Sequence, residues 1–295
     1  MLSILIPTYN YDCTKLVEAL QQQAEQASIN YEIIVADDAS PIHIYKEKNR
    51  ELNSLPHCRI IEQKKNMGRA RIRNRLADEA QYEWLLFMDA DAQVISSTFI
   101  TDYLAAISDE ADVICGGLCH ADTLPTPTVS LRYAYEKRAD KHRAACYRAE
   151  HPYERFTPFN FLIHRDTFLS IRFEESITEY GHEDTLFGIE LQKRAVRLKH
   201  IDNPLLHLGL ESNEVFLQKS QAALHNLATM EATMRDHSSL LRVYHWLQQL
   251  HLSKPLARCY TRHEAALTAH LCSPHPRLPL FFLYKLGYYC KIKQE

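Results

Sequence analysis

Short apolar runs alternate with amphipathic stretches along the first third of the chain. The runs with strand character are Leu2–Ile6, Glu32–Ala36, Arg59–Ile61, Trp84–Met88 and Asp112–Ile114. Each run is short and is followed by polar or turn-forming residues, as is typical of buried strands. Strands that alternate with helices are joined by right-handed crossovers. The pattern therefore predicts a mostly parallel sheet with helices on both faces, an α/β fold.

Helices are predicted between these strands and again further along the chain. Asp12 can cap a helix that continues through Gln23, and a polar helix is expected after Pro41. We expect further helices over residues 68–80 and 183–194. Residues 120–160 are rich in Pro, Tyr, His and Arg, and they are expected to form loops and one polar helix.

Beyond Ser212 the pattern becomes almost entirely helical. Residues on one helix face recur there at alternating steps of four and three: Phe216, Ser220, Ala223, Leu227, Met230 and Met234. Such a face is typical of a helix that packs on a core or on a partner helix. We therefore expect a main α/β domain over residues 1–210 and a helical extension over residues 211–295.

Composition narrows the class of protein. The 295 residues are 46% hydrophobic with a formal net charge of −3, so the chain can bury a large core but has no basic field for nucleic acid. No run reaches the roughly 20 apolar residues that span a bilayer, and no secretory leader follows Met1. The eight cysteines are scattered. These features predict a cytoplasmic protein with reduced cysteines.

Polar side chains follow three of the predicted strands where the strands end. They are, in chain order, Thr8, Tyr9, Asn10, Asp37, Asp38, Asp89 and Asp91. Parallel α/β sheets bind ligands beyond the carboxyl ends of their strands. The sequence therefore predicts one site at this edge of the sheet.

Asp89 and Asp91 can share a hard divalent cation. Mg²⁺ and Mn²⁺ take few carboxylates and complete their shells with water and phosphate oxygens, so a nucleotide diphosphate suits the remaining positions. The buried strand Trp84–Met88 would hold both carboxylates in place. Two solvated turn aspartates are the alternative, since this spacing alone is a weak signal.

An anion site is predicted where the helix at Gly68 begins. Gly68 permits a sharp turn, and a helix N-terminus favours negative charge. Arg69 and Arg73 lie on the same helix face and can add bidentate phosphate contacts. A carboxylate of the pair Asp37-Asp38 can accept hydrogen bonds from a base or a ribose, or the pair can instead cap a turn.

Two later segments carry further candidates. Glu183 and Asp184 open a predicted helix, where acidic residues either suit the helix dipole or supply a general base. Such a base would take the proton of an acceptor hydroxyl that attacks the anomeric carbon of a sugar. His207 lies among leucines, so it is either a satisfied core residue or a metal ligand.

These motifs together resemble those of family 2 glycosyltransferases. The matching segments are Ser3–Asn10, Glu32–Ser40, Asn66–Gly68 with Arg73-Asn74, Asp89–Asp91 and Gly181–Asp184. Their order over about the first 200 residues makes the joint match far more specific than any single motif. The resemblance implies a GT-A, Rossmann-like fold and an inverting mechanism. It also implies a nucleotide-sugar half over about residues 1–115 and an acceptor half over about residues 116–210.

By this resemblance, six residues would lie at the donor, Asp89 and the five that follow. The backbone near Pro7, with Tyr9 and Asp38, would hold the nucleotide base and ribose. Gly68 and Arg73 would lie near the rest of the donor. Ala39 and Ile72 replace a glycine and a small residue that are usual in the family, and this affects local loop geometry alone.

The same resemblance implies the remaining roles. Asp89 would contact the ribose or the donor sugar, and Asp91 would bind Mn²⁺ or Mg²⁺ together with His207. Asp184 would be the catalytic base, with Glu183 beside it holding acceptor or sugar hydroxyls. The implied reaction is a single in-line displacement in which metal and arginines neutralise the leaving diphosphate.

The resemblance favours a UDP-sugar donor of the hexosyl or N-acetylhexosaminyl class and a role in cell-surface polysaccharide or glycolipid synthesis. A sugar-nucleotide nucleotidyltransferase would share the sheet, but it would need a Gly-rich basic loop after the first strand, where this chain has Pro7–Asn10. A haloacid-dehalogenase phosphatase would need Thr or Val where Gln93 stands. Intact Asp89, Asp91 and Asp184 argue against an inactive sugar-binding module.

The segment Leu278–Cys290 is apolar and aromatic, with Lys285 within it. Aromatic and cationic side chains together suit a membrane interface, which would bring a peripheral enzyme to a lipid-linked glycan acceptor on the inner face of the membrane. The alternatives are that the segment packs on the protein as a terminal helix or against a second subunit of a homo-oligomer.

Overall fold

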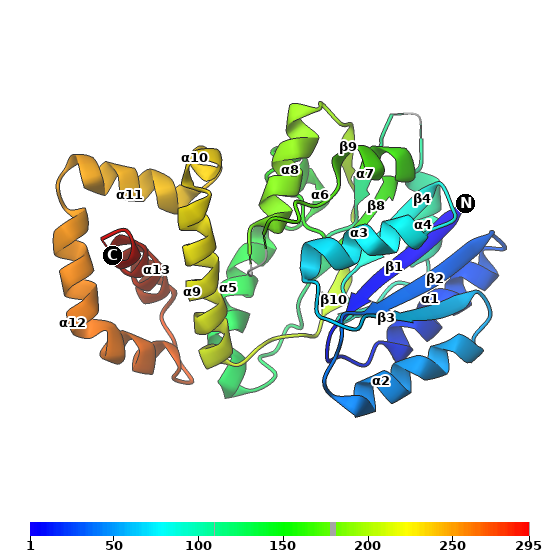
Figure 1. Ribbon diagram of the computed structural model, residues 1–295, viewed down its shortest axis with the longest axis horizontal. Helices are drawn as coiled ribbons and strands as arrows, with labels where there is room; N and C mark the ends of the chain where they lie inside the picture. Colours follow the sequence, from blue (N-terminus) through cyan, green and yellow to red (C-terminus); the bar gives the residue numbers. More distant parts are fainter. Residues whose placement is uncertain (109, 178–180, 295) are drawn as a thin grey trace. The chain divides into compact units, whose positions relative to one another are not determined.

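The computed structural model describes residues 1–108, 110–177 and 181–294 (Figure 1). The chain divides into two compact units. Unit 1 contains the described residues of 1–120, 140–177 and 183–209. Unit 2 contains residues 121–139 and 210–294, together with Gly181 and His182. Residues 121–139 therefore belong to the helical unit, although they lie between two parts of unit 1 in the sequence.

Unit 1 is built on a seven-stranded sheet of order β3-β2-β1-β4-β8-β6-β9. Its strands are β1 (Leu2–Thr8), β2 (Tyr31–Asp37), β3 (Cys58–Glu62), β4 (Trp84–Met88), β6 (Val113–Cys115), β8 (Asn160–His164) and β9 (Leu198–His200). Strand β8 is antiparallel to β4 and β6, and the other pairings are parallel. The predicted mostly parallel α/β sheet is confirmed, with β8 as an antiparallel strand that the sequence analysis did not predict.

Helices cover both faces of this sheet (Figure 1). They are α1 (Thr14–Gln26), α2 (His43–Arg50), α3 (Arg69–Glu79), α4 (Phe99–Ala106), α6 (Ala145–Ala149), α7 (Arg165–Ile171) and α8 (Glu183–Lys193). Short 3₁₀ helices lie at Glu51–Ser54, Pro127–Val129 and Asp140–His142. The N-cap residue of α1 is Cys13 rather than the predicted Asp12, but Asp12 just before it accepts hydrogen bonds from the Thr14 amide and hydroxyl at 3.1 and 2.7 Å.

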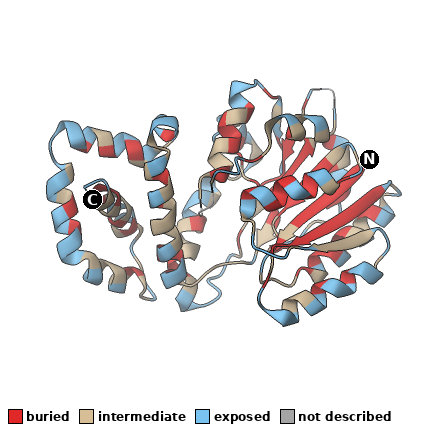
Figure 2. Cartoon of the chain, in the orientation of Figure 1, coloured by how far each residue is buried: buried red, intermediate tan, exposed pale blue. Residues whose placement is uncertain are grey.

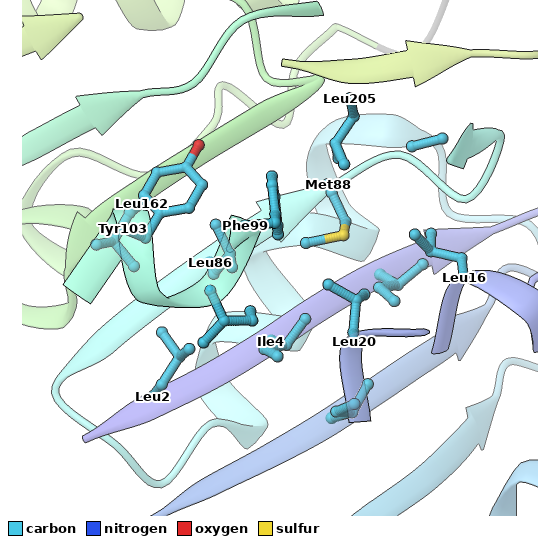
Figure 3. Close-up of a cluster of buried hydrophobic side chains, with 14 of the residues drawn as sticks. Leu2, Ile4, Leu16, Leu20, Leu86, Met88, Phe99, Tyr103, Leu162 and Leu205 are labelled. Carbon is cyan, nitrogen blue, oxygen red and sulfur yellow. The ribbon is translucent and has the colours of Figure 1, made fainter. Parts of the chain in front are cut away.

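The core of unit 1 consists of two layers, one on each side of the sheet. Alternate residues of β1 face opposite layers, because successive side chains of a strand point to opposite faces: Ile4 packs with α1 and α4, whereas Leu5 packs with α3. Figure 3 shows the first layer, in which Leu20 of α1 and Phe99 of α4 meet the strands. The central strands, such as β1, β2 and β4, are buried on both faces (Figure 2), which explains their continuous apolar runs, whereas the edge strand β3 is only partly buried.

A second, three-stranded sheet lies in unit 1 beyond the end of β4. It pairs β5 (Ala92–Gln93), β10 (Leu205–His207) and β7 (Leu118–Cys119) in the order β5-β10-β7. His207 is opposite Ala92 in the antiparallel β5–β10 pair, and Leu206 is opposite Cys119 in the parallel β10–β7 pair. This small sheet brings together three segments of the chain, and they lie next to Asp91.

Unit 2 is helical, as predicted for the end of the chain. Its helices are α5 (Ser130–Ala139), α9 (Asn213–Thr229), α10 (Glu231–Met234), α11 (Ser239–Gln249), α12 (Ser253–Leu271) and α13 (Leu278–Ile292). Within this unit α9, α11 and α12 surround α13 (Figure 1). The predicted face that begins at Phe216 is interrupted at Met230, where α9 ends and α10 begins.

Helix α13 contains the apolar segment for which a membrane contact was predicted. Phe281, Tyr284, Tyr289 and Cys290 are buried inside unit 2, which is the packing expected of a terminal helix. Phe282 remains exposed at its surface. Among the helices that the structure describes, we find no segment with the length and apolar character of a transmembrane span.

Candidate active site

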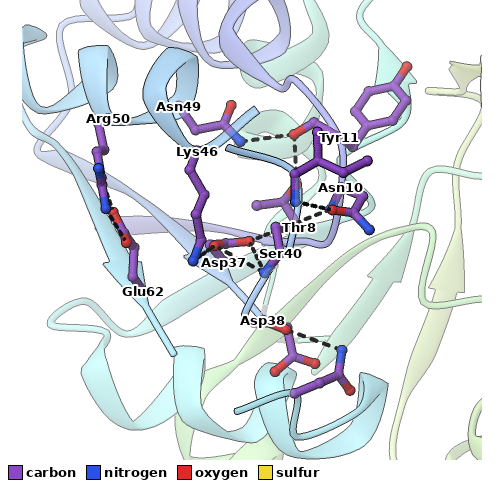
Figure 4. Close-up of polar contacts among 12 residues, drawn as sticks. Thr8, Asn10, Tyr11, Asp37, Asp38, Ser40, Lys46, Asn49, Arg50 and Glu62 are labelled. Atoms are coloured by element: carbon purple, nitrogen blue, oxygen red, sulfur yellow. Dashed lines mark hydrogen bonds and ion pairs between the residues drawn. The ribbon is translucent and has the colours of Figure 1, made fainter. Parts of the chain in front are cut away.

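The loops that follow β1 and β2 are tied to each other (Figure 4). The Asp38 amide donates to the Thr8 carbonyl at 2.9 Å, and the Asn10 amide donates to Ser40 Oγ at 2.7 Å. Asp37 is buried and accepts from the Ser40 amide and hydroxyl, with Lys46 Nζ at 3.7 Å. Asp37 therefore stabilises the turn, and Asp38 is the aspartate of the pair that extends toward α3.

The Asp38 carboxylate holds the loop that precedes α3. Its two oxygens accept hydrogen bonds from the Met67 amide at 2.7 Å and the Gly68 amide at 2.9 Å. Burial and the charge of Asp37 raise the pKa of Asp38, although these two bonds act in the opposite direction. Gly68 has φ of 86°, which explains a glycine at the start of the helix. A ribose could bond only the lone pairs of Asp38 that these amides leave free.

Arg73 is buried and binds Asp89. Its Nη2 lies 2.6 Å from Asp89 Oδ1, its Nη1 donates to the Arg69 carbonyl at 3.3 Å, and its guanidinium lies 5.5 Å from the centre of the Phe173 ring. Only 2% of Arg73 is exposed. In this arrangement the side chain holds Asp89 in one orientation and does not extend toward solvent as a free phosphate ligand.

The Asp91 carboxylate lies against the imidazole of His207, with Oδ2 and Nε2 3.2 Å apart. The β5–β10 pairing and a hydrogen bond from the Leu208 amide to the Asp91 carbonyl, at 2.9 Å, fix this contact. Burial alone would raise the pKa of Asp91. The hydrogen bond from His207 and the charges of His207 and Arg69 outweigh it, so that pKa is lowered. A Cβ on Gly209 would overlap Asp91 Oδ2, so the glycine leaves room for the Asp91 carboxylate in this position.

Two residues that the sequence analysis missed continue this contact. His207 Nδ1 lies 3.4 Å from His120 Nε2, and His120 Nδ1 lies 3.2 Å from Asp140 Oδ1. The chain Asp91–His207–His120–Asp140 orients the His207 ring from its far side. No local pattern marks His120, because its neighbour in space comes from β10.

Glu183 and Asp184 begin α8 and have different surroundings. Glu183 is buried, with Arg69 Nη1 3.8 Å from its Oε1. Burial and the charge of Asp184 raise the pKa of Glu183, against the opposing charges of Arg69 and Arg73. Asp184 is half-buried, and its Oδ1 accepts from the Thr185 amide at 2.7 Å. Because the charge of Arg69 acts on both Asp91 and Glu183, it joins the candidate residues.

The two tyrosines near the end of β1 differ in exposure. Tyr9, the predicted donor contact, is 50% exposed, and Pro7 beside it is half-buried. Tyr11, which the sequence analysis did not select, is half-buried. Burial and the charge of Asp91 raise the pKa of its phenol. Of these two tyrosines, Tyr11 is therefore the one whose phenol pKa is affected by the charge of Asp91.

The donor set at Asp91 and His207 suits a divalent metal. Adjacent ligands of a small octahedral ion lie about 3 Å apart, which matches the 3.2 Å between Oδ2 and Nε2. Within residues 1–108, 110–177 and 181–294, no three His, Cys, Asp or Glu side chains form a group that could hold a metal. Asp91 and His207 could thus supply one carboxylate and one imidazole, with other positions left to a ligand.

Comparison with known proteins places these features in a family. Residues 3–170 match the model of glycosyl transferase family 2. An uncharacterized glycosyltransferase of Haemophilus influenzae is 38% identical over 93 residues, 31% of this chain and 29% of the relative. The dolichol-phosphate mannosyltransferase of Pyrococcus furiosus is 34% identical over 116 residues, 39% of this chain and 32% of the relative. The alignments with four such relatives span 29–34% of the relatives' lengths.

Solved structures share the fold at low sequence identity. The mannosyltransferase PcManGT of Pyrobaculum calidifontis, in complex with GDP-Man and Mn²⁺, is 14% identical with a TM-score of 0.60, and the match covers 98% of this chain and 84% of that chain. TarS of S. aureus is 19% identical with a TM-score of 0.53, and the match covers 89% of this chain and 43% of that chain. These similarities extend through the helical end of the chain and support the GT-A assignment of the α/β fold.

Proposed function

The chain belongs to glycosyltransferase family 2, and on that premise we propose that it moves a sugar from a nucleotide-sugar donor to an acceptor hydroxyl with inversion at the anomeric carbon. The observation that carries the proposal is the contact between Asp91 and His207 at the carboxyl end of β4. Asp89 follows β4 and the loop fixed by Asp38 follows β2, the two strands that flank β1, so both lie at the same edge of the sheet. Unit 1 is the catalytic domain in this proposal, with unit 2 as a helical extension.

The donor is a UDP-sugar of the hexosyl or N-acetylhexosaminyl class. One TarS structure contains UDP-GlcNAc, and the PcManGT structure contains GDP-Man. The base and the sugar therefore need a direct test. Pro7, Tyr9 and the free lone pairs of Asp38 would hold the base and ribose. Asp89, oriented by Arg73, would contact the ribose or the sugar.

Asp91 and His207 would hold Mn²⁺ or Mg²⁺, and the imidazole favours Mn²⁺ because Mg²⁺ takes oxygen ligands. When bound, the ion would neutralise charge on the leaving diphosphate. Arg69 lies close enough to act on both Asp91 and Glu183, so its guanidinium would add positive charge beside the same diphosphate. Gly68 would bring the N-terminus of α3 to the donor.

Asp184 would be the general base. It is half-buried, whereas Glu183 is buried beside Arg69, where its carboxylate would hold acceptor or sugar hydroxyls. The Asp184 carboxylate would take the proton as the acceptor oxygen bonds to the anomeric carbon and the diphosphate oxygen leaves from the opposite side. That geometry inverts the configuration at the carbon.

The acceptor is a glycan or a lipid-linked glycan of a cell-surface polysaccharide or glycolipid. A chondroitin synthase of Escherichia coli and a cholesterol galactosyltransferase of Borreliella burgdorferi are among the relatives, at 22% and 24% identity. Their names include both polymer and lipid products. We place the enzyme in the cytoplasm or on the inner face of the membrane.

A thermal-shift panel tests the proposal. UDP-, GDP- and dTDP-sugars are compared with and without Mn²⁺, because only a ligand of the folded state raises the melting temperature by mass action. The matching nucleotide diphosphate should appear in solution when an acceptor is added. Stabilisation by a nucleoside triphosphate with pyrophosphate release would indicate a nucleotidyltransferase instead. Donor binding without any turnover over a broad acceptor panel would indicate a sugar-binding module.

A further inference from the structure

Helix α11 carries apolar side chains on two different faces. Its buried face, within unit 2, is formed by Leu241, Tyr244 and Leu247. Further apolar side chains of α11 and the turn that follows it are between 44% and 57% exposed: Val243, Trp246, Leu250 and Leu252. Val243 and Trp246 on the helix and Leu250 at its C-cap follow at steps of three and four, so they share a second face. A tryptophan and aliphatic residues exposed together mark a contact surface.

Basic residues dominate the charges around this second face, with the exposed Asp236 as the one carboxylate just before α11. Residues 237–263 contain no Asp or Glu. They contain four exposed permanent cations, Arg242, Lys254, Arg258 and Arg262. Arg242 lies one turn before Trp246, and Lys254 follows directly after the exposed Leu252 turn. The apolar face is therefore bordered by cations at both ends of α11.

The acidic residues nearest in sequence are Asp236, which is exposed just before α11, and Glu231 and Glu264, which are paired within unit 2. Glu231 contacts His245, Lys293 and the Tyr289 hydroxyl at 2.9–3.1 Å. Glu264 accepts from Lys291 and from the Tyr260 hydroxyl, both at 3.0 Å. These carboxylates thus neutralise other groups, and the cations beside α11 remain available to an external anion.

We propose that α11 and the turn into α12 bind the surface of an anionic phospholipid bilayer. Trp246 and Leu250 would enter the interfacial region, where an indole and aliphatic side chains are stabilised together. Arg242, Lys254 and Arg258 would bind lipid phosphates. The face assigned here is α11, whereas the sequence pattern pointed to Leu278–Cys290, a helix that α9, α11 and α12 largely enclose.

Two other partners fit these observations less well. A symmetric dimer through this face would bring the same cations toward each other, and residues 237–263 offer no carboxylate to neutralise them. A nucleic acid would satisfy the cations but would leave Val243 and Leu250 without an apolar partner. The bilayer satisfies both the charge and the apolar side chains. The proposal concerns unit 2 and does not depend on the identity of the donor.

Co-sedimentation of the full chain with vesicles tests the proposal. We expect the protein to sediment at low salt with vesicles of phosphatidylcholine and phosphatidylglycerol and to remain in solution with phosphatidylcholine alone. Trp246→Ala should weaken binding about tenfold. The triple variant Arg242→Glu, Lys254→Glu, Arg258→Glu should weaken it roughly a hundredfold. Ile44→Ala is the matched control, because Ile44 on α2 has the same 57% exposure as Trp246 and should bind like the wild type.

Tryptophan fluorescence gives a second measurement of vesicle binding that does not depend on sedimentation. The chain has two tryptophans, so in a Trp84→Phe background the emission reports Trp246 alone. It should shift to shorter wavelength on anionic vesicles and be quenched by brominated lipid. Failure to bind anionic vesicles, or equal binding by Trp246→Ala, would overturn the proposal. A dimer that is seen in light scattering and that Trp246→Ala dissociates would also overturn it. RNA that competes with the vesicles without any change in Trp246 emission would do the same.

Discussion

Asp91 and His207 are 116 residues apart in the sequence and 3.2 Å apart in the structure. A two-residue strand, β5, and a three-residue strand, β10, bring them together. The contact depends on backbone pairing rather than on a local motif. The candidate metal site is therefore a product of the small second sheet as much as of the aspartates themselves.

Replacement of Asp91 tests the metal assignment. Asp91→Ala should abolish Mn²⁺-dependent binding of the nucleotide sugar, because in the proposed site this carboxylate would be the oxygen ligand that the protein supplies. The fold should remain, since the side chain lies at a strand end. Calorimetric titration of donor with and without Mn²⁺ measures the effect, and Asp102→Ala on α4 serves as an exposed control. Normal metal-dependent binding by Asp91→Ala would move the metal to another site.

Gly209 offers a test that leaves both proposed ligands in place. In Gly209→Ala the new methyl would displace the Asp91 carboxylate, and we expect Mn²⁺ affinity to fall by about tenfold or more. Paramagnetic resonance of free Mn²⁺ measures that affinity without an assay of transfer. The neighbouring Leu208→Ala, at an exposed position, should bind Mn²⁺ normally. Equal affinity in Gly209→Ala would show that Asp91 can relax or is not a ligand.

Asp184→Asn tests the base. The amide has nearly the same shape but cannot accept the proton, so transfer should fall by roughly 10² or more while donor affinity stays nearly constant. Single-turnover transfer and donor titration separate the two effects. Glu183→Gln is the matched comparison and should alter acceptor KM more than the chemical step. If the two variants exchange these behaviours, Glu183 is the base.

Ala39 is strained, and its replacement should stabilise the protein. Its φ is 61°, in the left-handed region where an L-residue with a Cβ is disfavoured. Ala39→Gly should raise the free energy of unfolding by roughly 0.5–1 kcal/mol, after the larger entropy of glycine in the unfolded chain is counted. Urea unfolding measures it. Ala27→Gly, where φ is −73°, should lower that free energy instead. A loss of stability in Ala39→Gly would contradict the strain.

The ammonium group of Lys285 predicts a pH dependence of stability. Burial lowers its pKa from 10.5 to about 8, although the rings of Tyr135, Phe281 and Phe282 lie within 4.7–5.2 Å of Nζ. The unfolded chain therefore binds this proton more tightly than the folded chain. Burial of the protonated ammonium therefore lowers the stability of the folded state. This loss is complete below about pH 8 and disappears as the pH rises toward 10.5.

At pH 7, the free energy of unfolding of Lys285→Met should therefore exceed that of the wild type by at most about 3 kcal/mol. The difference should shrink between pH 8 and 10.5. Denaturant unfolding of both proteins over this range provides the measurement, with Lys15→Met as the exposed control. A difference independent of pH would mean that the methionine acts through packing alone.

The sequence predicted the parts of this protein whose signals are local. Five strands, the helices between them and the aspartates at the strand ends follow from apolar periodicity and turn residues. Strand β8 could not be predicted in the same way, because Asn160–His164 follows an irregular stretch and is defined by its partners β4 and β6. The burial of Arg73 was also missed, since its charge suggests solvent and only the Asp89 contact explains its position.

The residues around the predicted ligands were less accessible to sequence reasoning than the ligands themselves. His120, Asp140 and Tyr11 have no motif of their own. His120 is identified by its contact with His207, Asp140 by its contact with His120, and Tyr11 by the charge of Asp91. The same holds for α13, whose composition suits both an interface with lipid and a helical core. Only the arrangement of α9, α11 and α12 around it distinguishes the two.

The position of β8 in the sheet has a consequence for synthesis on the ribosome. Strand β4 pairs with β1 on one edge, but its other edge stays unpaired until Asn160–His164 has been synthesised. The second sheet can form only after Leu205–His207 has been synthesised. Helix α5 can contact its partners in unit 2 only after α9 and α13 have been synthesised. A nascent chain that stops near residue 115 would thus expose an unpaired strand edge. We expect such a truncated product to depend on chaperones, and ligand binding to appear only after most of the message is translated.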